Sequence, residues 1–376
     1  MSGSQPPPSV LDCFAELPDP RRAQGQRNKL IDILFIALCA VLCGADDFTE
    51  MEEVGHAKET WLRQFLELPH GIPSHDTFGR VFALLEPHAF AAAFRRWTSG
   101  VAQVMAGEVV AVDGKTVRRS SDRAAGREAI ELVSAWAGEN RLTLGQLKVA
   151  TSSNEITAVS ELLQVLALKG CIVTVDALNC QQNIAAHIRQ QEADYVSALK
   201  GNHAGLHQRV AQFFNSVREG RTAGFGISQH RTCDKEHGRI EERHFWQVNA
   251  PEDLRASREW ADLQSVGLCE AVRDIKGHVT TTQRYYLSSL PVEAVKFSAA
   301  VRGHWAVENS CHWVLDVVFH EDDARVRVGH AAENFATVRR LANNLLQRER
   351  TVKRGVKTKR LKAALDERYL LKVLRT

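Results

Sequence analysis

The stretch VVAVDGK at residues 109–115 decides how the rest of this chain is interpreted. Four apolar residues lead directly into Asp113, a pattern typical of a buried strand that ends in a carboxylate. A second apolar run, residues 171–175, leads into Asp176 in the same way. A buried carboxylate is strongly destabilising unless it is paired or binds a cation. The two aspartates therefore predict a shared polar site at the ends of two strands.

A third acidic residue, Glu308, lies in the sequence RGHWAVEN at residues 302–309, within a helix that we predict over residues 292–317. Two strand-borne aspartates and a helix-borne glutamate could hold a pair of divalent metal ions, the usual device for cutting and rejoining phosphodiesters. Mg²⁺ prefers oxygen ligands and keeps several waters, so few carboxylates suffice. We expect Asp113 to bridge both ions, Asp176 to hold one and Glu308 the other.

The order of the predicted elements indicates how the two aspartates come together. We predict strands at 108–117, 131–137, 142–150, 171–176 and 194–199, with helices at 152–169 and 181–192. An antiparallel meander followed by alternating helices and strands is the ribonuclease H-like arrangement, an α/β fold with a mixed five-stranded sheet flanked by helices. In that fold the first and fourth strands are neighbours, which would bring Asp113 beside Asp176.

The remaining segments complete the predicted domain organisation. Residues 1–10 are expected to be disordered, and residues 11–105 are expected to form an all-helical N-terminal domain that could contact DNA. The catalytic domain would span residues 106–350. Residues 201–290 would be an insertion before the glutamate, with a helix near 206–217 and short strands that include 240–248 and 280–287. Residues 351–376 are rich in Lys and Arg and are expected to be a basic tail.

Composition narrows the class of protein. The 376 residues are 44% apolar and 25% charged, which is ordinary for a soluble globular protein. The most apolar run, residues 33–45, is too short to span a bilayer and predicts a buried helix. The eight cysteines include no Cys-x-x-Cys pair, which favours a reducing cytoplasm and argues against a structural zinc site.

Two other sets of polar residues leave alternatives open. His304, Glu308 and His312 share one face of the predicted helix and could bind zinc, but a zinc site there would leave both strand aspartates unexplained. Several polar side chains could contact DNA, or could simply be solvated. These candidates are Lys115, Lys200, Asn202, Arg239, Arg302, His304, His312, Lys353, Arg354, Lys359 and Arg360.

The chain closely resembles the H-repeat-associated DDE transposases of bacterial insertion sequences (the ISAs type). The resemblance covers nearly the whole chain and rests on ordered motifs: Asp19-Pro20-Arg21-Arg22, the sequence IPSHDTF at 72–78, VDGKT at 112–116, VDA at 175–177, and RGHWAVEN at 302–309, continued by HWVLDV at 312–317. It implies a ribonuclease H-like catalytic domain with an insertion and an associated helical N-terminal domain. It also implies an acidic triad, Asp113, Asp176 and Glu308, that binds two Mg²⁺ or Mn²⁺ ions.

The implied function is DNA transposition. Such an enzyme binds the terminal inverted repeats of its element, cleaves at the ends and joins the 3′ hydroxyl to target DNA. We expect a homodimer when two ends are paired, and a cytoplasmic protein associated with the nucleoid. Two alternatives remain: a catalytically idle DNA-binding protein derived from a mobile element, and a metal-dependent nuclease without strand transfer.

The chain departs from a broader group of DDE transposases at three positions. That group carries Tyr, Arg and Lys at fixed offsets around the glutamate, where this chain has Val301, His304 and Leu315. His304 or the nearby Arg302 is expected to take over the phosphate contact. The departure leaves open whether cleavage passes through a hairpin intermediate.

Overall fold

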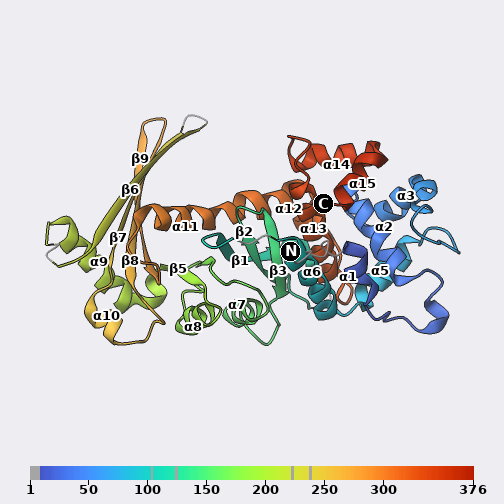
Figure 1. The fold of residues 1–376 in the computed structure, drawn as a ribbon. Coiled ribbons are helices and arrows are strands. Elements are labelled where there is room, and N and C mark those ends of the chain that lie inside the picture. Colours follow the sequence, from blue (N-terminus) through green and yellow to red (C-terminus); the bar gives the residue numbers. More distant parts are fainter. Residues whose placement is uncertain (1–8, 103–104, 123–125, 222–223, 237–238) are drawn as a thin grey trace, which may run out of the picture. The chain divides into compact units, whose positions relative to one another are not determined.

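The computed structural model describes residues 9–102, 105–122, 126–221, 224–236 and 239–376, and these residues form two compact units (Figure 1). Unit 1 comprises residues 1–103, 114–152 and 308–376, and unit 2 comprises residues 104–113 and 153–307. The chain therefore passes between the units several times. One of these passages occurs inside the first strand, directly after Asp113, and another directly before Glu308.

Unit 1 is mainly helical. Its α-helices are α1 (Val10–Ala15), α2 (Leu30–Cys43), α3 (Phe48–Ala57), α4 (Glu59–Leu62), α5 (His75–Leu84), α6 (Pro87–Val101), α12 (Trp313–Val317), α13 (Ala331–Arg348), α14 (Val356–Leu365) and α15 (Glu367–Leu374). Helix α13 contacts α2, α5, α6, α14 and α15, so the first helices of the chain share one core with the last. A separate all-helical N-terminal domain is thus not confirmed.

The two ends of the chain differ from the expected picture in different ways. Of the predicted disordered segment, residues 1–8 lie outside the described residues, whereas Ser9 caps α1 and Val10 is its first residue. The expected basic tail instead forms α14 and α15. Leu370 and Val373 on α15 are buried, because this helix has one apolar face that packs against α2, α13 and α14.

The strands of unit 1 are β2 (Ile130–Ala137), β3 (Leu142–Lys148) and the last part of β1 (Val109–Val117), in the order β3–β2–β1. β2 and β3 pair antiparallel, as the meander predicts. Helices α6 and α13 contact β3. Short 3₁₀ turns occur at Ala23–Gly25, Arg118–Ser120 and Glu321–Asp323, and a π-helical segment at Glu308–His312 leads into α12.

Unit 2 is a mixed sheet with helices. The first part of β1 is followed in the sheet by β4 (Ile172–Val175), β5 (Asp194–Leu199), β9 (His278–Ser288), β8 (Ser265–Ile275), β7 (Arg239–Asn249) and β6 (Ile227–Glu236). β1, β4 and β5 are parallel, and the remaining pairings are antiparallel. Its helices are α7 (Glu155–Gln164), α8 (Gln182–Gln190), α9 (Ala204–Arg218), α10 (Glu252–Ala256) and α11 (Ala294–Val307), with a 3₁₀ turn at Gly201–His203.

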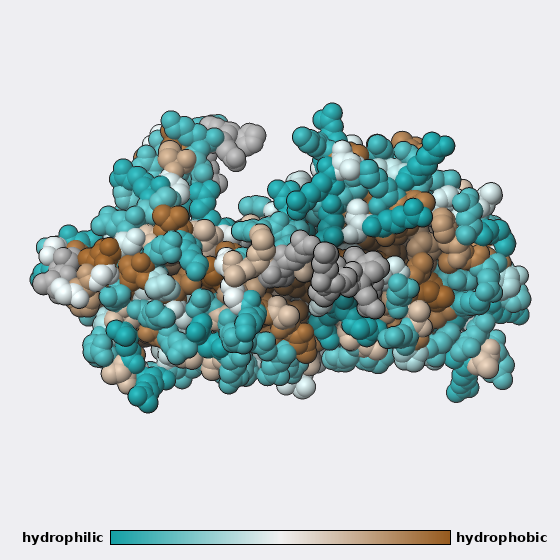
Figure 2. Space-filling model, in the orientation of Figure 1, coloured by the Kyte–Doolittle hydropathy of each residue, from teal (hydrophilic) through white to brown (hydrophobic). Residues whose placement is uncertain are grey.

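The predicted insertion is more regular than its sequence suggests. It adds four long strands, β6 to β9, which extend the sheet from β5 through the β5–β9 pairing. Strand β8 was not predicted, although Lys276 and Gly277 between β8 and β9 both have positive φ, as a two-residue hairpin turn requires. Hydrophobic residues form small patches over these strands in Figure 2, and Ile240, Ile275 and Val279 are among the exposed ones.

Helix α11 packs across the sheet of unit 2 and sets the geometry near the acidic residues. Phe297 lies against Gly267 of β8, where a Cβ atom would come within 2.2 Å of the ring. Further along the helix, Gly303 packs on Val109 of β1, and a Cβ there would lie 2.8 Å from a valine methyl. Both glycines are needed because the helix backbone and the sheet approach each other closely at these points.

Candidate active site

Asp113 and Asp176 lie next to each other on two paired strands: Asp113 is in the middle of β1, and Asp176 directly follows the last residue of β4. β1 and β4 are parallel, and their last registered pair is Val112 with Val175. The next residue on each strand is the aspartate, and paired strands lie about 4.8 Å apart. Side chains alternate between the faces of a strand, so Asp113 shares a face with Val109, which packs against α11. The strand pairing that was predicted to bring the two acids together is present.

The loop after β4 holds Asp176 in one orientation. Asn179 donates two hydrogen bonds to Oδ1 of Asp176, one from its backbone N–H and one from its side-chain amide, both at 3.0 Å. The same amide also donates to Glu155 at 2.6 Å. Within the described residues Oδ2 of Asp176 accepts no hydrogen bond, so this oxygen is available to another ligand.

The loop after β5 supports the loop after β4. Asn202 donates to the carbonyl of Ala177 at 2.6 Å, and Nε2 of His203 lies 2.7 Å from the carbonyl of Cys180. Asn202, predicted as a DNA contact, is therefore also a structural support next to Asp176. Lys200, in the same loop, is exposed.

His304 lies on the α11 face of the sheet, beside the end of β4. Its Nδ1 is 3.0 Å from Oγ1 of Thr174, which precedes Asp176 by two residues. Burial lowers the pKa of His304, while the charge of Asp176 acts in the opposite direction. At neutral pH the imidazole is therefore mainly neutral. Its Nδ1 either donates a hydrogen bond to the threonine hydroxyl or accepts one from it, depending on the tautomer. The neighbouring Arg302 is exposed and pairs with Asp234 at 3.2 Å.

Glu308 is exposed and begins the π-helical segment that directly follows α11. Such segments inside helices are frequent at functional sites, because the extra residue changes the direction of the side chains that follow. That change also alters the spacing on which the zinc alternative rests, since His304 and His312 no longer follow one continuous α-helix. In the described part of the chain, no three His, Cys, Asp or Glu residues are grouped in a way that could hold a metal ion.

The donor set fits magnesium only in part. The carboxylates of Asp113 and Asp176 are oxygen donors of the kind that Mg²⁺ prefers. An ion that keeps several waters needs few protein ligands. The Oδ2 atom of Asp176 is suitably unoccupied by hydrogen bonds. Glu308 belongs to unit 1 and the two aspartates belong to unit 2.

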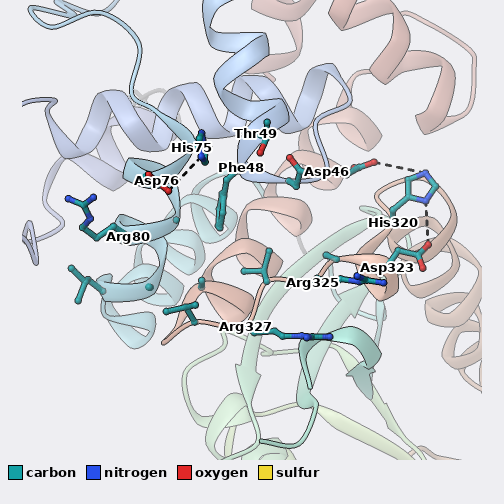
Figure 3. Close-up of a pocket in the computed structure, with 18 residues that line it drawn as sticks. Asp46, Phe48, Thr49, His75, Asp76, Arg80, His320, Asp323, Arg325 and Arg327 are labelled. Atoms are coloured by element: carbon teal, nitrogen blue, oxygen red, sulfur yellow. Dashed lines mark ion pairs between the residues drawn. The ribbon is translucent and has the colours of Figure 1, made fainter. Parts of the chain in front are cut away.

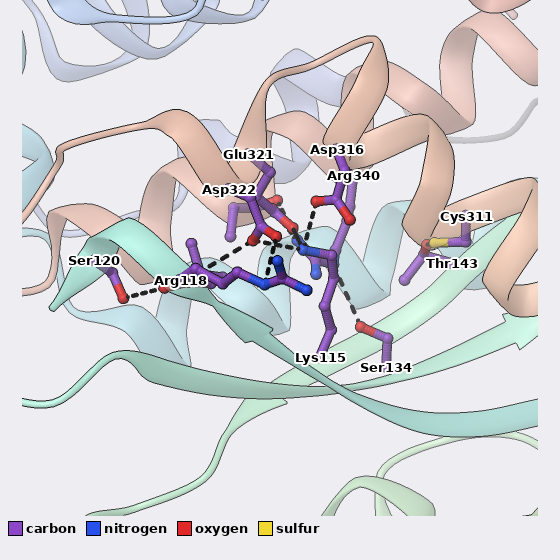
Figure 4. Close-up of polar contacts among 12 residues, drawn as sticks. Lys115, Arg118, Ser120, Ser134, Thr143, Cys311, Asp316, Glu321, Asp322 and Arg340 are labelled. Atoms are coloured by element: carbon purple, nitrogen blue, oxygen red, sulfur yellow. Dashed lines mark hydrogen bonds and ion pairs between the residues drawn. The ribbon is translucent and has the colours of Figure 1, made fainter.

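Lys115, another predicted DNA contact, lies in a buried cluster of charges in unit 1 (Figure 4). Its ammonium group is 2.7 Å from Asp316, 3.1 Å from Asp322 and 3.4 Å from Glu321. Arg340 reaches Glu321 from the other side at 2.7 Å. Burial alone would raise the pKa of Glu321, but Arg340 and Lys115 lower it to about 2. Lys115 is thus held inside the protein, two residues after Asp113.

Glu321 lies in a run of charged residues at 320–325, a pattern typical of a solvated turn, but its side chain is fully buried. No local signal separates the two cases, because the partners of Glu321 come from β1 and α13. The adjacent arginines at 339 and 340 are the available hint, since they lie between the apolar residues Phe335, Val338, Leu341 and Leu345.

The remaining DNA-contact candidates fall into three groups. Lys353 and Arg354 form the first group and are exposed. Arg239 stands alone: it begins β7, but its side chain lies outside the described residues. Lys359 and Arg360 are buried and donate to backbone carbonyls, Lys359 to Leu346 at 2.7 Å and Arg360 to Val41 at 3.0 Å. Their side chains are therefore unavailable to DNA in this structure, contrary to expectation.

A separate pocket of about 890 Å³ lies in unit 1 (Figure 3). Apolar residues such as Phe48, Leu84 and Val328 line it, and ion pairs lie at its edge, where His75 meets Asp76 and His320 meets Asp323. None of the three predicted acidic residues lines this pocket, so its volume is no guide to the catalytic chemistry.

Comparisons with known proteins agree with the resemblance seen in the motifs. A family model described as "Transposase DDE domain" matches residues 105–345, and one described as "DDE_Tnp_1-associated" matches residues 11–98. The "Putative transposase YncI" of Escherichia coli O157:H7 is 40% identical over 97% of this chain and 94% of its own length. The "H repeat-associated putative transposase YhhI" of Escherichia coli K12 is 38% identical over 97% of both chains.

Proposed function

Because this chain belongs to the DDE transposase family, we propose that it cleaves DNA at the terminal inverted repeats of an insertion sequence and transfers the resulting ends to target DNA. The observation that carries the proposal is the parallel register of β1 and β4, whose last pair, Val112 with Val175, is followed by Asp113 on one strand and by Asp176 after the other. Two adjacent carboxylates of this kind form a polar centre suited to divalent cations.

The catalytic centre in this proposal consists of Asp113, Asp176 and Glu308, with two Mg²⁺ or Mn²⁺ ions. Bound metal would make water a stronger nucleophile and stabilise the leaving oxygen of an in-line displacement. Asn179 donates both of its hydrogen bonds to Oδ1 of Asp176 and so leaves Oδ2 for a metal ion. Glu308 follows the last residue of α11, and this helix is anchored to β1 and β4 through Gly303 and His304.

We further infer a ribonuclease H-like catalytic fold. The strand order β3–β2–β1 in unit 1 and β1–β4–β5 in unit 2 supports it, as do the antiparallel pairing of β2 with β3 and the parallel pairing of β1, β4 and β5. Strands β6 to β9 would then be the insertion that precedes the glutamate.

DNA would meet the protein around this centre. The proposed contacts are Lys200, Arg302, Lys353 and Arg354, which are exposed, and Arg239 and His312. His304 would position Thr174 and the end of β4 and could donate to a phosphate oxygen. Two element ends would be held by a homodimer, and the protein would work in the cytoplasm at the nucleoid. No helix among the described residues has the length and apolar character needed to cross a membrane.

The test is cleavage of a DNA fragment that carries the inverted repeat, with Mg²⁺ present. We expect Asp113→Asn, Asp176→Asn and Glu308→Gln each to abolish cleavage and joining, while each variant still binds the repeat. Removal of the metal from the wild-type protein with EDTA should have the same effect. Lys372→Gln, on the exposed surface of α15, is the matched control and should cleave normally.

The outcomes separate the alternatives. Normal cleavage by any of the three acid variants would remove that residue from the centre. Repeat binding by the wild-type protein without any cleavage would identify an idle DNA-binding protein. Cleavage without joined products would identify a nuclease.

A further inference from the structure

A second pocket of unit 1, of about 930 Å³, begins one residue after Glu308. Three segments line it: the turn between β2 and β3, residues 309–318, and the connection from α13 to α14. Its volume is within the range of pockets that bind small ligands or parts of larger ones, roughly 300–1,000 Å³.

The rim of this pocket is basic. Arg141, Arg350, Lys353, Arg354 and Lys357 line it; all five side chains are exposed, and none has an ion-pair partner within the described residues. We call the pocket with this rim the basic groove. Unpaired basic side chains that surround one depression create a positive potential that attracts phosphates.

The acidic residues of the basic groove do little to neutralise the rim. Glu349 is buried and accepts hydrogen bonds from the backbone N–H of Thr351 at 2.9 Å and from the hydroxyl of Tyr369 at 2.9 Å. Burial would raise the pKa of Glu349, but a hydrogen bond from the Thr351 hydroxyl, together with these bonds, lowers it to about 2. The buried Lys359 lies 4.0 Å away. Only Glu139 adds an exposed carboxylate.

The floor of the basic groove is apolar. Trp313 is 56% exposed and Val317 is 46% exposed, and the two lie four residues apart on one face of α12. Within the described residues, no aromatic ring or cation contacts the indole of Trp313. An exposed indole beside several cations offers a flat surface on which a planar ring can stack.

We propose that the basic groove binds an unpaired segment of single-stranded DNA, with a base stacked on Trp313 and the adjoining phosphates on the basic rim. A duplex keeps its base faces stacked inside, so it could use the rim but not the indole. A single strand uses both, which is the general design of single-strand binding surfaces. Asn309 and Ser310 line the basic groove directly after Glu308, so the bound strand lies beside the segment that carries this residue.

This inference rests on the proposed action on DNA but not on the identity of the metal ligands. It is tested by binding of the full-length protein in EDTA, where cleavage does not occur. The probes are a fluorescent single-stranded oligothymidylate and a duplex of equal length without the repeat sequence, compared by fluorescence anisotropy. Failure of cleavage in the acid variants would leave this measurement unchanged, so the two proposals fail separately.

We expect Trp313→Ala to weaken single-strand binding roughly 5- to 150-fold, the range expected for loss of one stacked base. Trp313→Phe should retain most of the affinity, and duplex binding should change little in both variants. Lys353→Gln with Arg354→Gln should reduce the slope of log affinity against log salt by about 1.4 for the single strand. Lys372→Gln, an exposed lysine outside the groove, is the control.

The proposal is overturned if Trp313→Ala binds the single strand as tightly as the wild-type protein does. It is also overturned if the substitution weakens single-strand and duplex binding equally, because the groove would then contact only the phosphate backbone. Circular dichroism of each variant excludes misfolding as the cause of any loss.

Discussion

The buried pair of Arg340 and Glu321 gives a prediction whose magnitude follows from the structure. Both side chains are fully buried, and they meet at 2.7 Å in unit 1 (Figure 4). Replacing Arg340 with Met would leave Glu321 with Lys115 at 3.4 Å as its ion-pair partner, and with the more distant charge of Arg339. Breaking one partner of a buried ion pair costs about 3–5 kcal/mol, because an incompletely compensated charge stays inside the protein.

The pKa of Glu321 leads to the same magnitude. Burial by itself would raise this pKa, but the charges of Arg340 and Lys115 lower it from 4.5 to about 2. That difference corresponds to roughly 3 kcal/mol. Because the pKa of the folded state is the lower one, the stabilisation is complete above pH 4.5 and is lost as the pH falls toward 2.

The assay is urea unfolding of the full chain at pH 7 and at several values down to pH 3. We expect Arg340→Met to lower the free energy of unfolding by about 3–5 kcal/mol at pH 7, and the difference from the wild-type protein to shrink below pH 4.5. Arg354→Met is the matched control, because this arginine is exposed and its replacement should change stability by less than about 0.5 kcal/mol. A loss below about 1 kcal/mol at pH 7, or a difference that stays constant with pH, would refute the reasoning.

Two further predictions concern unit 2. Asn179→Ala removes the side-chain hydrogen bond to Asp176 but keeps the backbone one. Cleavage should therefore require an Mg²⁺ concentration about 10- to 100-fold higher. An unchanged Mg²⁺ titration would show that this amide does not orient the carboxylate. Gly267→Ala places a methyl group against Phe297, so we expect a loss of about 1–3 kcal/mol in urea unfolding. Gly205→Ala, in α9 where the added Cβ meets open space, should be neutral or stabilising by up to about 1 kcal/mol, and equal effects of the two substitutions would contradict the packing argument.

Local patterns in the sequence predicted the elements that carry the candidate site. The apolar run at 109–112 is the first part of β1, and the run at 171–175 contains β4; each leads into its aspartate. Strands β2, β3 and β5 and helices α7, α8 and α9 also lie close to the predicted ranges. Membership of the transposase family, inferred from the ordered motifs, is confirmed by the family model and the relatives.

What the sequence alone determined was therefore the periodicity of each segment and the chemistry at its ends, because both depend on neighbours along the chain. Only the tertiary structure decided which distant residues meet. It placed Lys115 among Asp316, Glu321 and Asp322, folded the basic C-terminal segment into α14 and α15, and joined strands β6 to β9 to the edge of β5. Whether a charge is buried with a partner or exposed to a ligand depends on such long-range packing, to which local patterns are insensitive.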